Sequence, residues 1–291
     1  MMKLAHIFLA IVVAAIWGLN FVVIKLGLED FPPLLFSCLR FLLSAIPAIF
    51  FLRMPEVKWR YLLLIGLVLG VIKFSFLFEG ISFGMSAGLS SLVLQAQVFF
   101  SVIWAVIFFK ERFVLNNIIG IICGLIGLVI IVYDLNSNST LTGFIFTILA
   151  AIAWSISNIL MRKMGRVKML NFMVWMSIIP IIPLFILSYK IEGAMIILNS
   201  IQHIQPMGIF ALGYVSFLAT VFGYGAWGWL LGHYPVGTVA PFALLVPVFG
   251  IIAANLIFHE ELSLAKILAI SFIFMGLLIN TFGAKLVRCI K

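Results

Sequence analysis

A few polar side chains interrupt the long apolar segments of this chain, and these residues could do chemistry. Trp17 and Asn20 stand about one helical turn apart, so their side chains share a helix face. Trp154 and Asn158, four residues apart, repeat the pattern. An indole offers an apolar wall and one donor, and an amide offers a donor and an acceptor. Two such faces favour a small zwitterion over an ion as ligand. The alternative is that the asparagines bond across helix interfaces and the tryptophans pack.

Two glutamines extend this set. Gln95 and Gln97 are two positions apart, roughly 200° around a helix, so they cannot both face one cavity. We expect one to point inward and the other to bond a neighbouring helix, and the sequence does not say which. Phe99, one turn from Gln95, could form an aromatic wall of the same cavity.

Two further aromatic residues stand in a glycine-rich run. Tyr224 and Trp227 lie within 223–228, which holds three glycines in six residues. Glycines at this density loosen a helix and permit bending. The run therefore predicts a hinge that also contributes aromatic side chains to the cavity.

Three charged residues lie inside apolar segments, where charge is costly and usually functional. Lys73 stands near the middle of its segment. It could bind a substrate carboxylate, act as a proton-coupled switch, or form half of a buried pair. Arg40 and Glu79 lie toward the same end of their segments, so an Arg40–Glu79 ion pair is an equally natural hypothesis.

The elements that position these residues are membrane-spanning helices. The chain of 291 residues is 65% apolar and only 9% charged. Apolar runs of about 18–25 residues predict spanning helices. The expected fold is an all-α membrane protein with ten transmembrane helices, near 4–26, 33–52, 61–80, 88–109, 116–133, 142–162, 170–189, 207–231, 236–258 and 264–283.

An internal repeat divides these helices into two halves. Eight residues recur without a gap 149 positions later: Gly88, Phe100, Ile103, Phe109, Glu111, Leu115, Gly127 and Leu128 match Gly237, Phe249, Ile252, Phe258, Glu260, Leu264, Gly276 and Leu277. Trp17 and Lys25 are echoed by Trp154 and Arg162 at an offset of 137, so about twelve residues were gained, most simply in 190–206. We expect two five-helix repeats, 1–139 and 140–291, in one membrane domain. An odd number of spans per repeat inverts the second relative to the first, as in many transporters.

Glu111 and Glu260 occupy equivalent places after the fourth span of each half. A carboxylate there can accept backbone N–H bonds at a helix N-terminus. The alternative is a gate in which each glutamate pairs with a basic group in one conformation.

The formal net charge of +9 reflects orientation in the membrane. Basic residues gather in the segments expected on the side of the two termini, and only Lys25, Lys190 and Lys266 fall on the other side. This asymmetry predicts cytoplasmic termini and requires no nucleic-acid partner.

Several function classes lack support in the sequence. The three cysteines have no paired spacing, so neither a disulfide framework nor a metal site is expected. No phosphate-binding Gly-Lys-Ser/Thr loop is present, which argues against ATP hydrolysis. No paired catalytic constellation emerges either, so we expect a protein that is not an enzyme and needs no cofactor.

Parts of the chain also resemble a known family. The run from Trp17 to Lys25, reading WGLNFVVIK, with Pro32-Pro33 and Leu39-Arg40-Phe41, resembles the EamA family of the drug/metabolite transporter superfamily. The segment Phe83 to Phe100, reading FGMSAGLSSLVLQAQVFF, is similar to that of bacterial exporters of O-acetylserine and cysteine. The resemblance covers nearly the whole chain. It implies a central cavity built from the first, third, fourth, sixth, eighth and ninth helices, and efflux across the bacterial inner membrane.

Together these patterns predict a secondary exporter of small amino acids or their derivatives, with cysteine and O-acetylserine as preferred substrates. The expected substrate contacts are Trp17, Asn20, Lys73, Gln95, Phe99, Trp154, Asn158, Tyr224 and Trp227. The candidates for coupling or gating are Lys73, Glu79, Arg40, Glu111 and Glu260. The rival readings are an exporter of hydrophobic cations, with Glu79 as counter-charge, and a membrane protein that does not transport. Substrate range, direction, ion coupling and oligomeric state stay open.

Overall fold

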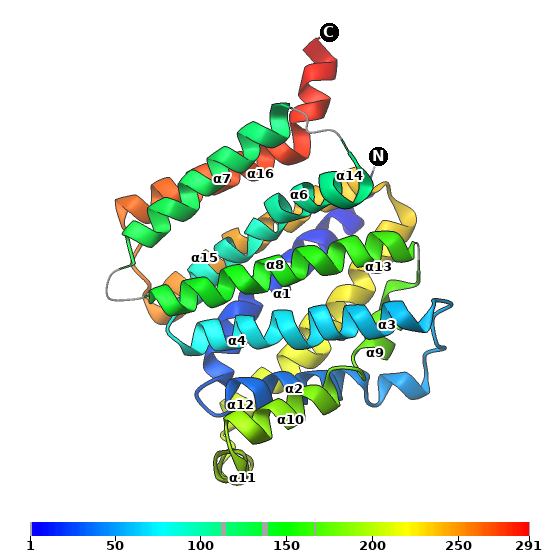
Figure 1. The fold of residues 1–291 in the computed structure, drawn as a ribbon, viewed down its shortest axis with the longest axis vertical. Coiled ribbons are helices and arrows are strands. Elements are labelled where there is room, and N and C mark those ends of the chain that lie inside the picture. Colours follow the sequence, from blue (N-terminus) through cyan, green and yellow to red (C-terminus); the bar gives the residue numbers. More distant parts are fainter. Residues whose placement is uncertain (1, 112–114, 136–138, 166, 291) are drawn as a thin grey trace.

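The computed structural model describes residues 2–111, 115–135, 139–165 and 167–290, and throughout these residues the regular structure is helical (Figure 1). Ten helical spans are long and apolar enough to cross a membrane, which confirms the predicted class and number of spans. In a bilayer a helix satisfies all its own backbone hydrogen bonds, so apolar runs of this length have little alternative.

Each half of the chain supplies five of these spans. The first half contains α1 (Leu4–Gly27); α2 (Pro33–Ala45) with η1 (Ala48–Phe50); α3 (Trp59–Ile65), η2 (Gly66–Lys73) and α4 (Phe74–Ser82); α5 (Ala87–Val93), η3 (Leu94–Ala96) and α6 (Gln97–Phe109); and α7 (Leu115–Tyr133). The second half contains α8 (Leu141–Met164); α9 (Met169–Met176) and α10 (Ile181–Ile191); α12 (Pro206–Gly213), η4 (Tyr214–Phe222) and α13 (Gly223–His233); α14 (Val236–Val239), η5 (Ala240–Leu244) and α15 (Leu245–Phe258); and α16 (Leu264–Ile290).

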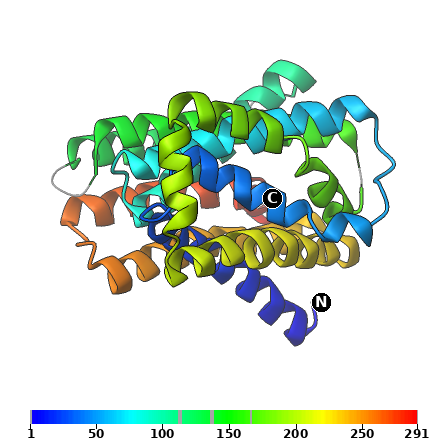
Figure 2. The same cartoon turned by 90° about the horizontal axis from the view of Figure 1, so that it is seen from below.

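One additional helix, α11 (Ala194–Gln202), lies where the second half is longer than the first. It is seen end-on in Figure 1 and runs across the spans in Figure 2. The expected insertion at 190–206 is thus a short helix that lies across the bundle.

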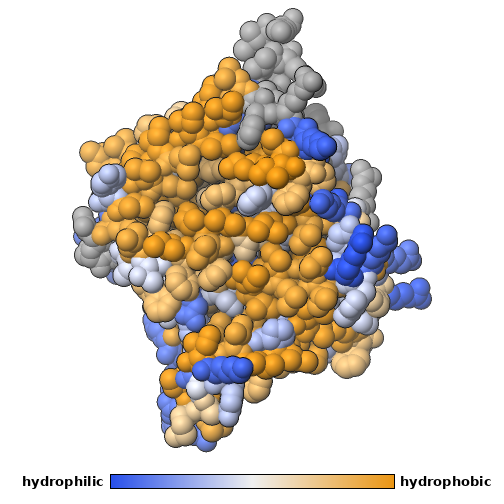
Figure 3. All heavy atoms as spheres, viewed as in Figure 1, coloured by the Kyte–Doolittle hydropathy of each residue, from blue (hydrophilic) through white to orange (hydrophobic). Residues whose placement is uncertain are grey.

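The spans run roughly from left to right in Figure 1, and α1 begins and α16 ends at their right-hand ends. We call this side of the molecule the termini face and the left-hand side the opposite face. Between the two edges the surface is broadly apolar (Figure 3). Large aromatic side chains, among them Phe31, Phe36, Phe41, Phe78 and Phe172, fill the interior. Helices that are apolar on both their packed and exposed sides fit a lipid surrounding rather than water.

Four spans depart from α-helical geometry at matching places in the two halves. The π-helical segments η2 and η4 lie in the third and eighth spans, and the 3₁₀ segments η3 and η5 lie in the fourth and ninth. Shifting η2 by the repeat offset of 149 residues places it on η4 to within one residue at its start. Hydropathy carries no signal for such segments, which often occur at functional sites.

Small residues let helices of this chain pack closely together. Gly120 of α7 faces Asn280 of α16, and Gly70 of η2 faces Pro180 beside α10. These glycines therefore support helix packing within this chain.

Candidate functional site

Three predicted aromatic residues meet between the two halves. The ring centres of Tyr224 and Trp227 lie 5.3 and 5.2 Å from the Trp17 indole. The indole N–H of Trp17 donates to the carbonyl of Ala219 in η4 at 2.9 Å. A side chain at Gly223 would collide with the indole, since an added Cβ would lie 2.6 Å from Nε1. The glycine-rich run thus admits the tryptophan of the other half.

Asn20 lies one turn further along α1 and is buried. Its Oδ1 has no hydrogen-bond partner among the residues that the structure describes. A buried amide oxygen without a donor is unfavourable. This acceptor is therefore available to a ligand donor.

Arg40 of α2 is also buried, at 3% exposure. Its Nε and Nη2 donate to the Thr220 hydroxyl of η4 at 3.3 and 3.0 Å, and its guanidinium lies 3.9 Å from the Phe74 ring centre. Nη1 has no acceptor within the described ranges. The hypothesis of an Arg40–Glu79 ion pair is therefore wrong in this conformation, because Arg40 is directed across to the second half.

The ammonium of Lys73, at the end of η2, lies over the Phe74 ring and near Trp154, the second predicted tryptophan. Nζ lies 3.4 Å from the ring centre of Phe74 and 5.0 Å from that of Trp154. Side-chain exposure at Lys73 is 5%. In the described part of the chain neither Lys73 nor Arg40 forms an ion pair, because the two ion pairs found there involve other residues.

Glu79 lies away from these cations. Its electrostatic neighbour is Glu192, which accepts backbone N–H bonds from Leu34 and Leu35 at the start of α2. The structure thus places Glu79 toward the opposite face.

Gln95 and Gln97 contact different parts of the second half. Gln95 is buried, and its Nε2 reaches the carbonyl of Ala243 in η5 at 3.5 Å. Gln97 accepts a 2.6 Å hydrogen bond from Asn158, which also contacts Ser101 at 3.3 Å. Asn158 therefore bonds across a helix interface, as the alternative interpretation held, and does not join Trp154 beside Lys73.

Phe99 does not form the expected wall. Its ring inserts against Gly124 of α7 and Gly276 of α16. Because this insertion points the ring toward the α7–α16 pair, it is directed away from the cluster around Trp17.

A groove of about 380 Å³ lies between α6, α7 and α8, in the half of the molecule next to the termini face. Its lining includes Gln97, Ser101, Asn158, Glu111 and Arg162. The groove connects the polar Gln97–Asn158 contact with an ion pair at the ends of α6 and α8.

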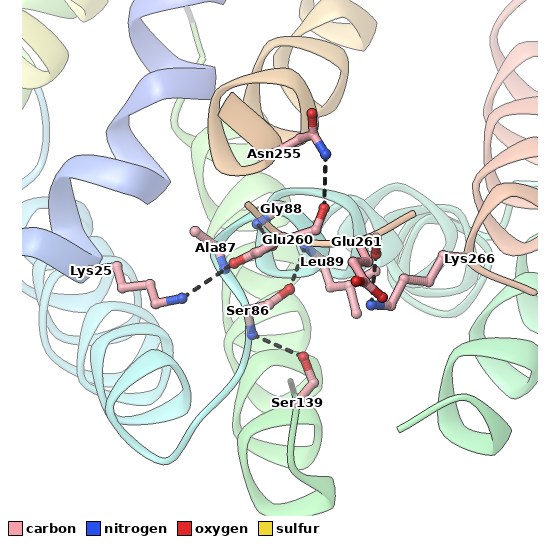
Figure 4. A network of polar contacts seen from close by, with 10 residues as sticks. All are labelled: Lys25, Ser86, Ala87, Gly88, Leu89, Ser139, Asn255, Glu260, Glu261 and Lys266. Carbon is pink, nitrogen blue, oxygen red and sulfur yellow. Dashed lines mark hydrogen bonds and ion pairs between the residues drawn. The ribbon is translucent and has the colours of Figure 1, made fainter. Parts of the chain in front are cut away.

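On the opposite face, Glu260 joins two elements of the first half, α1 and α5 (Figure 4). Its carboxylate lies 3.3 Å from the Lys25 ammonium and accepts N–H bonds from Ala87 and Gly88 of α5 at 3.0 and 3.2 Å. The predicted N-terminal capping is thus confirmed for Glu260, and the capped helix belongs to the other half. About 10 Å deeper along α1, Gly18 packs directly on Phe249 of α15.

On the termini face, Glu111 pairs with Arg162. These are the repeat equivalents of Glu260 and Lys25. Both side chains are about half exposed, at 44% and 52%, compared with 13% and 34% for Glu260 and Lys25. Within the described contacts the Glu111 carboxylate bonds Arg162 and no backbone N–H. Both ion pairs are present together, so ion pairing is not what distinguishes the two faces.

Sequence reasoning missed Thr220 and Phe74 as partners of the buried cations. It also missed that Lys25 and Arg162 pair with the equivalent glutamates. The second signal was available, because Lys25 and Arg162 are repeat equivalents, as are Glu260 and Glu111.

The sequence is similar to that of known proteins over nearly its whole length. The model of the EamA-like transporter family matches the chain twice, over residues 4–133 and 141–282. A "Probable amino-acid metabolite efflux pump" of Escherichia coli (strain K12) is 42% identical over 97% of both chains. A protein of the same description from Salmonella typhimurium (strain LT2) is 44% identical over 97% of this chain and 96% of its own.

A solved crystal structure has the same fold. It superimposes with a TM-score of 0.62 over 98% of this chain and 99% of its own, at 16% identity. At that identity the likeness concerns the fold alone.

Proposed function

This chain belongs to the EamA-like transporter family, and on that premise we propose that it exports small amino acids or their metabolites across the bacterial inner membrane, with cysteine and O-acetylserine as preferred substrates. The names of its relatives from E. coli and S. typhimurium support amino-acid metabolites as the substrate class. The observation that carries the proposal is the buried polar cluster between the halves, where Asn20 Oδ1 and Arg40 Nη1 have no hydrogen-bond partner and Lys73 forms no ion pair among the described residues. Buried polar groups without partners are characteristic of a site that a ligand completes.

The substrate would bind where the two halves meet. Trp17, Tyr224 and Trp227 would supply an aromatic wall, and Asn20 Oδ1 an acceptor for an ammonium or hydroxyl donor. Lys73 and Trp154 would contact it from the other side, with Lys73 as carboxylate ligand or coupling residue. Gln95 of η3 lies beside η5, where the 3₁₀ segments of the fourth and ninth spans meet.

Transport would proceed by alternating access. In this conformation the opposite face is held together by the Glu260 contacts, while a groove is present toward the termini face. If the closed arrangement passed to the equivalent helices at the termini face and the opposite face opened, the site would be exposed to each side of the membrane in turn. With the termini in the cytoplasm, as the basic residues favour, a state closed at the opposite face would be the one that opens inward.

The glutamates would act through helix ends. Glu260 caps α5, and the equivalent N–H groups for Glu111 are those of Val236 and Gly237 at the start of α14. We expect the capping contact to pass from Glu260 to Glu111 when the transporter changes state. The Lys25 and Arg162 ion pairs would keep each carboxylate in place.

A cation exporter is less well supported. Such a site needs a buried carboxylate, and the buried charged side chains in the described residues are the basic Arg40 and Lys73. Glu79 is only partly buried and lies near Glu192.

Counterflow in proteoliposomes tests the proposal. Vesicles preloaded with unlabelled cysteine or O-acetylserine should accumulate the labelled compound, and protein-free vesicles should not. Absence of counterflow for both compounds, with purified protein that remains folded, would remove the proposed substrates.

A further inference from the structure

The two buried cations share one aromatic ring. Arg40 Cζ and Lys73 Nζ lie 3.9 and 3.4 Å from the centre of Phe74. This arrangement places two positive charges at the middle of the membrane-spanning bundle, from α2 and η2. Because both groups are positively charged and lie beside the same ring, they repel each other.

Nothing in the described residues neutralises these charges. The two described ion pairs lie at the helix ends, and Glu79 faces Glu192. Phe74 gives each cation an aromatic face, and Thr220 gives Arg40 one hydroxyl acceptor. Buried charges are normally paired or hydrogen-bonded, because desolvation is otherwise uncompensated.

Arg40 keeps one donor directed at no protein atom. Nη1 is fully buried and lacks an acceptor among the described residues. The Thr220 bonds fix the guanidinium by its Nε and Nη2, so Nη1 is the donor left for a ligand. Charge-assisted hydrogen bonds to a carboxylate are the ones that a guanidinium and an ammonium form most strongly, so a ligand carboxylate suits both cations beside Phe74.

From these contacts we infer that Arg40 and Lys73 form a carboxylate-binding site that binds amino-acid metabolites of net negative charge, such as N-acylated or dicarboxylic amino acids, more tightly than zwitterions. The inference keeps the proposed substrate class, amino-acid metabolites, and revises the order within it, because zwitterionic cysteine and O-acetylserine would then be the weaker ligands. A free ammonium would add a third positive charge to a site that holds two. Blocking the amine removes that charge and keeps the carboxylate. The inference rests on the proposed function, and it names the part of the substrate that the site recognises.

The test uses three probes of similar size: N-acetylcysteine, cysteine and cysteine methyl ester. Binding to the purified full-length protein is measured by thermal unfolding at increasing probe concentration. We expect N-acetylcysteine to bind most tightly, cysteine less tightly, and the ester at least tenfold more weakly than N-acetylcysteine. An ester that binds as well as N-acetylcysteine, or a zwitterion that binds more tightly, would overturn the inference.

Variants separate ligand binding from structure. Arg40→Gln and Lys73→Met should each lower the affinity for N-acetylcysteine at least tenfold, and Lys73→Arg should restore most of it. Lys190→Met, which removes an exposed cation of α10, is the matched control and should change neither affinity nor unfolding.

Unliganded stability distinguishes a binding role from a structural one. Lys73→Met removes an unpaired buried charge and no described hydrogen bond, so its unfolding temperature without ligand should equal or exceed that of the unchanged protein. A lower unfolding temperature together with undiminished N-acetylcysteine binding would show that Lys73 is structural. If cysteine shows counterflow and cysteine methyl ester, whose carboxylate is blocked, exchanges equally fast, this inference is overturned and the proposed function stands.

Discussion

The two faces of the molecule are built from equivalent residues and differ in how tightly they are held. On the opposite face, Glu260 binds Lys25 and two N–H groups of α5, and below this face α1 packs against α15 at Gly18. On the termini face, Glu111 binds Arg162 at the rim of a groove. Because the ion pair is common to both faces, the difference lies in the contacts added to it. Closure of a face therefore depends on helix capping and close packing rather than on charge pairing.

The centre of the molecule teaches the complementary lesson. Many equivalent positions keep their residue types, whereas several near the middle of the third and fourth spans do not. Lys73 corresponds to Phe222, Ser75 to Tyr224 and Gln95 to Leu244. The equivalent positions that keep their residue types preserve the helix contacts of both halves. The positions that differ give the two sides of the site different side chains.

Crowding the contact at Gly18 should have the largest effect on this comparison. An added Cβ would lie 2.6 Å from Phe249 Cβ, so Gly18→Leu opposes closure of the opposite face. Because the added side chain also meets the backbone of Val246 and Gly250, we expect the upper end of the overpacking cost of about 1–3 kcal/mol, or roughly a hundredfold loss of counterflow. Gly213→Leu is the matched control, because no atom lies within 4 Å of its added Cβ. Equal activity of the two variants would contradict the role of this contact.

Neutralising the two glutamates should separate the faces by a smaller margin. Glu260→Gln weakens two charge-assisted N–H bonds and a half-buried ion pair, a loss of about 1.5–3 kcal/mol, or roughly tenfold or more in the rate. Glu111→Gln weakens an exposed pair worth about 0–1 kcal/mol. Counterflow measured side by side should show the order Glu260→Gln below Glu111→Gln. The reverse order would mean that the termini face is the tighter gate.

Replacing the equivalent tryptophans tests whether they differ in structural role. Trp17→Phe removes the 2.9 Å bond to Ala219 and should destabilise the protein by about 1 kcal/mol. Trp154 has no described hydrogen bond from its indole, so Trp154→Phe should leave stability nearly unchanged. Thermal unfolding in detergent measures both. Similar losses for the two variants would remove the distinction.

Making the centre symmetric at one position should have the smallest effect on stability. Gln95→Leu reproduces the residue at 244 and removes a long 3.5 Å contact, which contributes little. We expect a change in stability below about 0.5 kcal/mol and a rise of a few-fold in the half-saturating substrate concentration. An unchanged half-saturation would show that Gln95 does not contact substrate.

The spans, their number and the repeat could be predicted because the bilayer limits spanning chains to helices and duplication leaves a fixed offset. Side-chain partners could not, because these helices are apolar on every side and hydropathy does not fix their rotation. Arg40 was matched with Glu79 by depth alone, whereas its rotation in α2 directs it to Thr220. Phe99 was assigned to the cavity by its α-helical spacing from Gln95, although Gln95 lies within the 3₁₀ segment η3 and Phe99 in α6, so that spacing does not hold.

The most direct test of the account uses equivalent reporters on the two faces. In a background without Cys38, Cys123 and Cys289, Val102→Cys lies in the termini-face groove and Ile251→Cys takes its repeat equivalent, which is buried. A membrane-impermeant thiol reagent should label Val102→Cys faster than Ile251→Cys, and adding Glu260→Gln should raise labelling at 251 and lower it at 102. Equal labelling at both positions, or a ratio that Glu260→Gln leaves unchanged, would contradict the claim that Glu260 holds the opposite face closed.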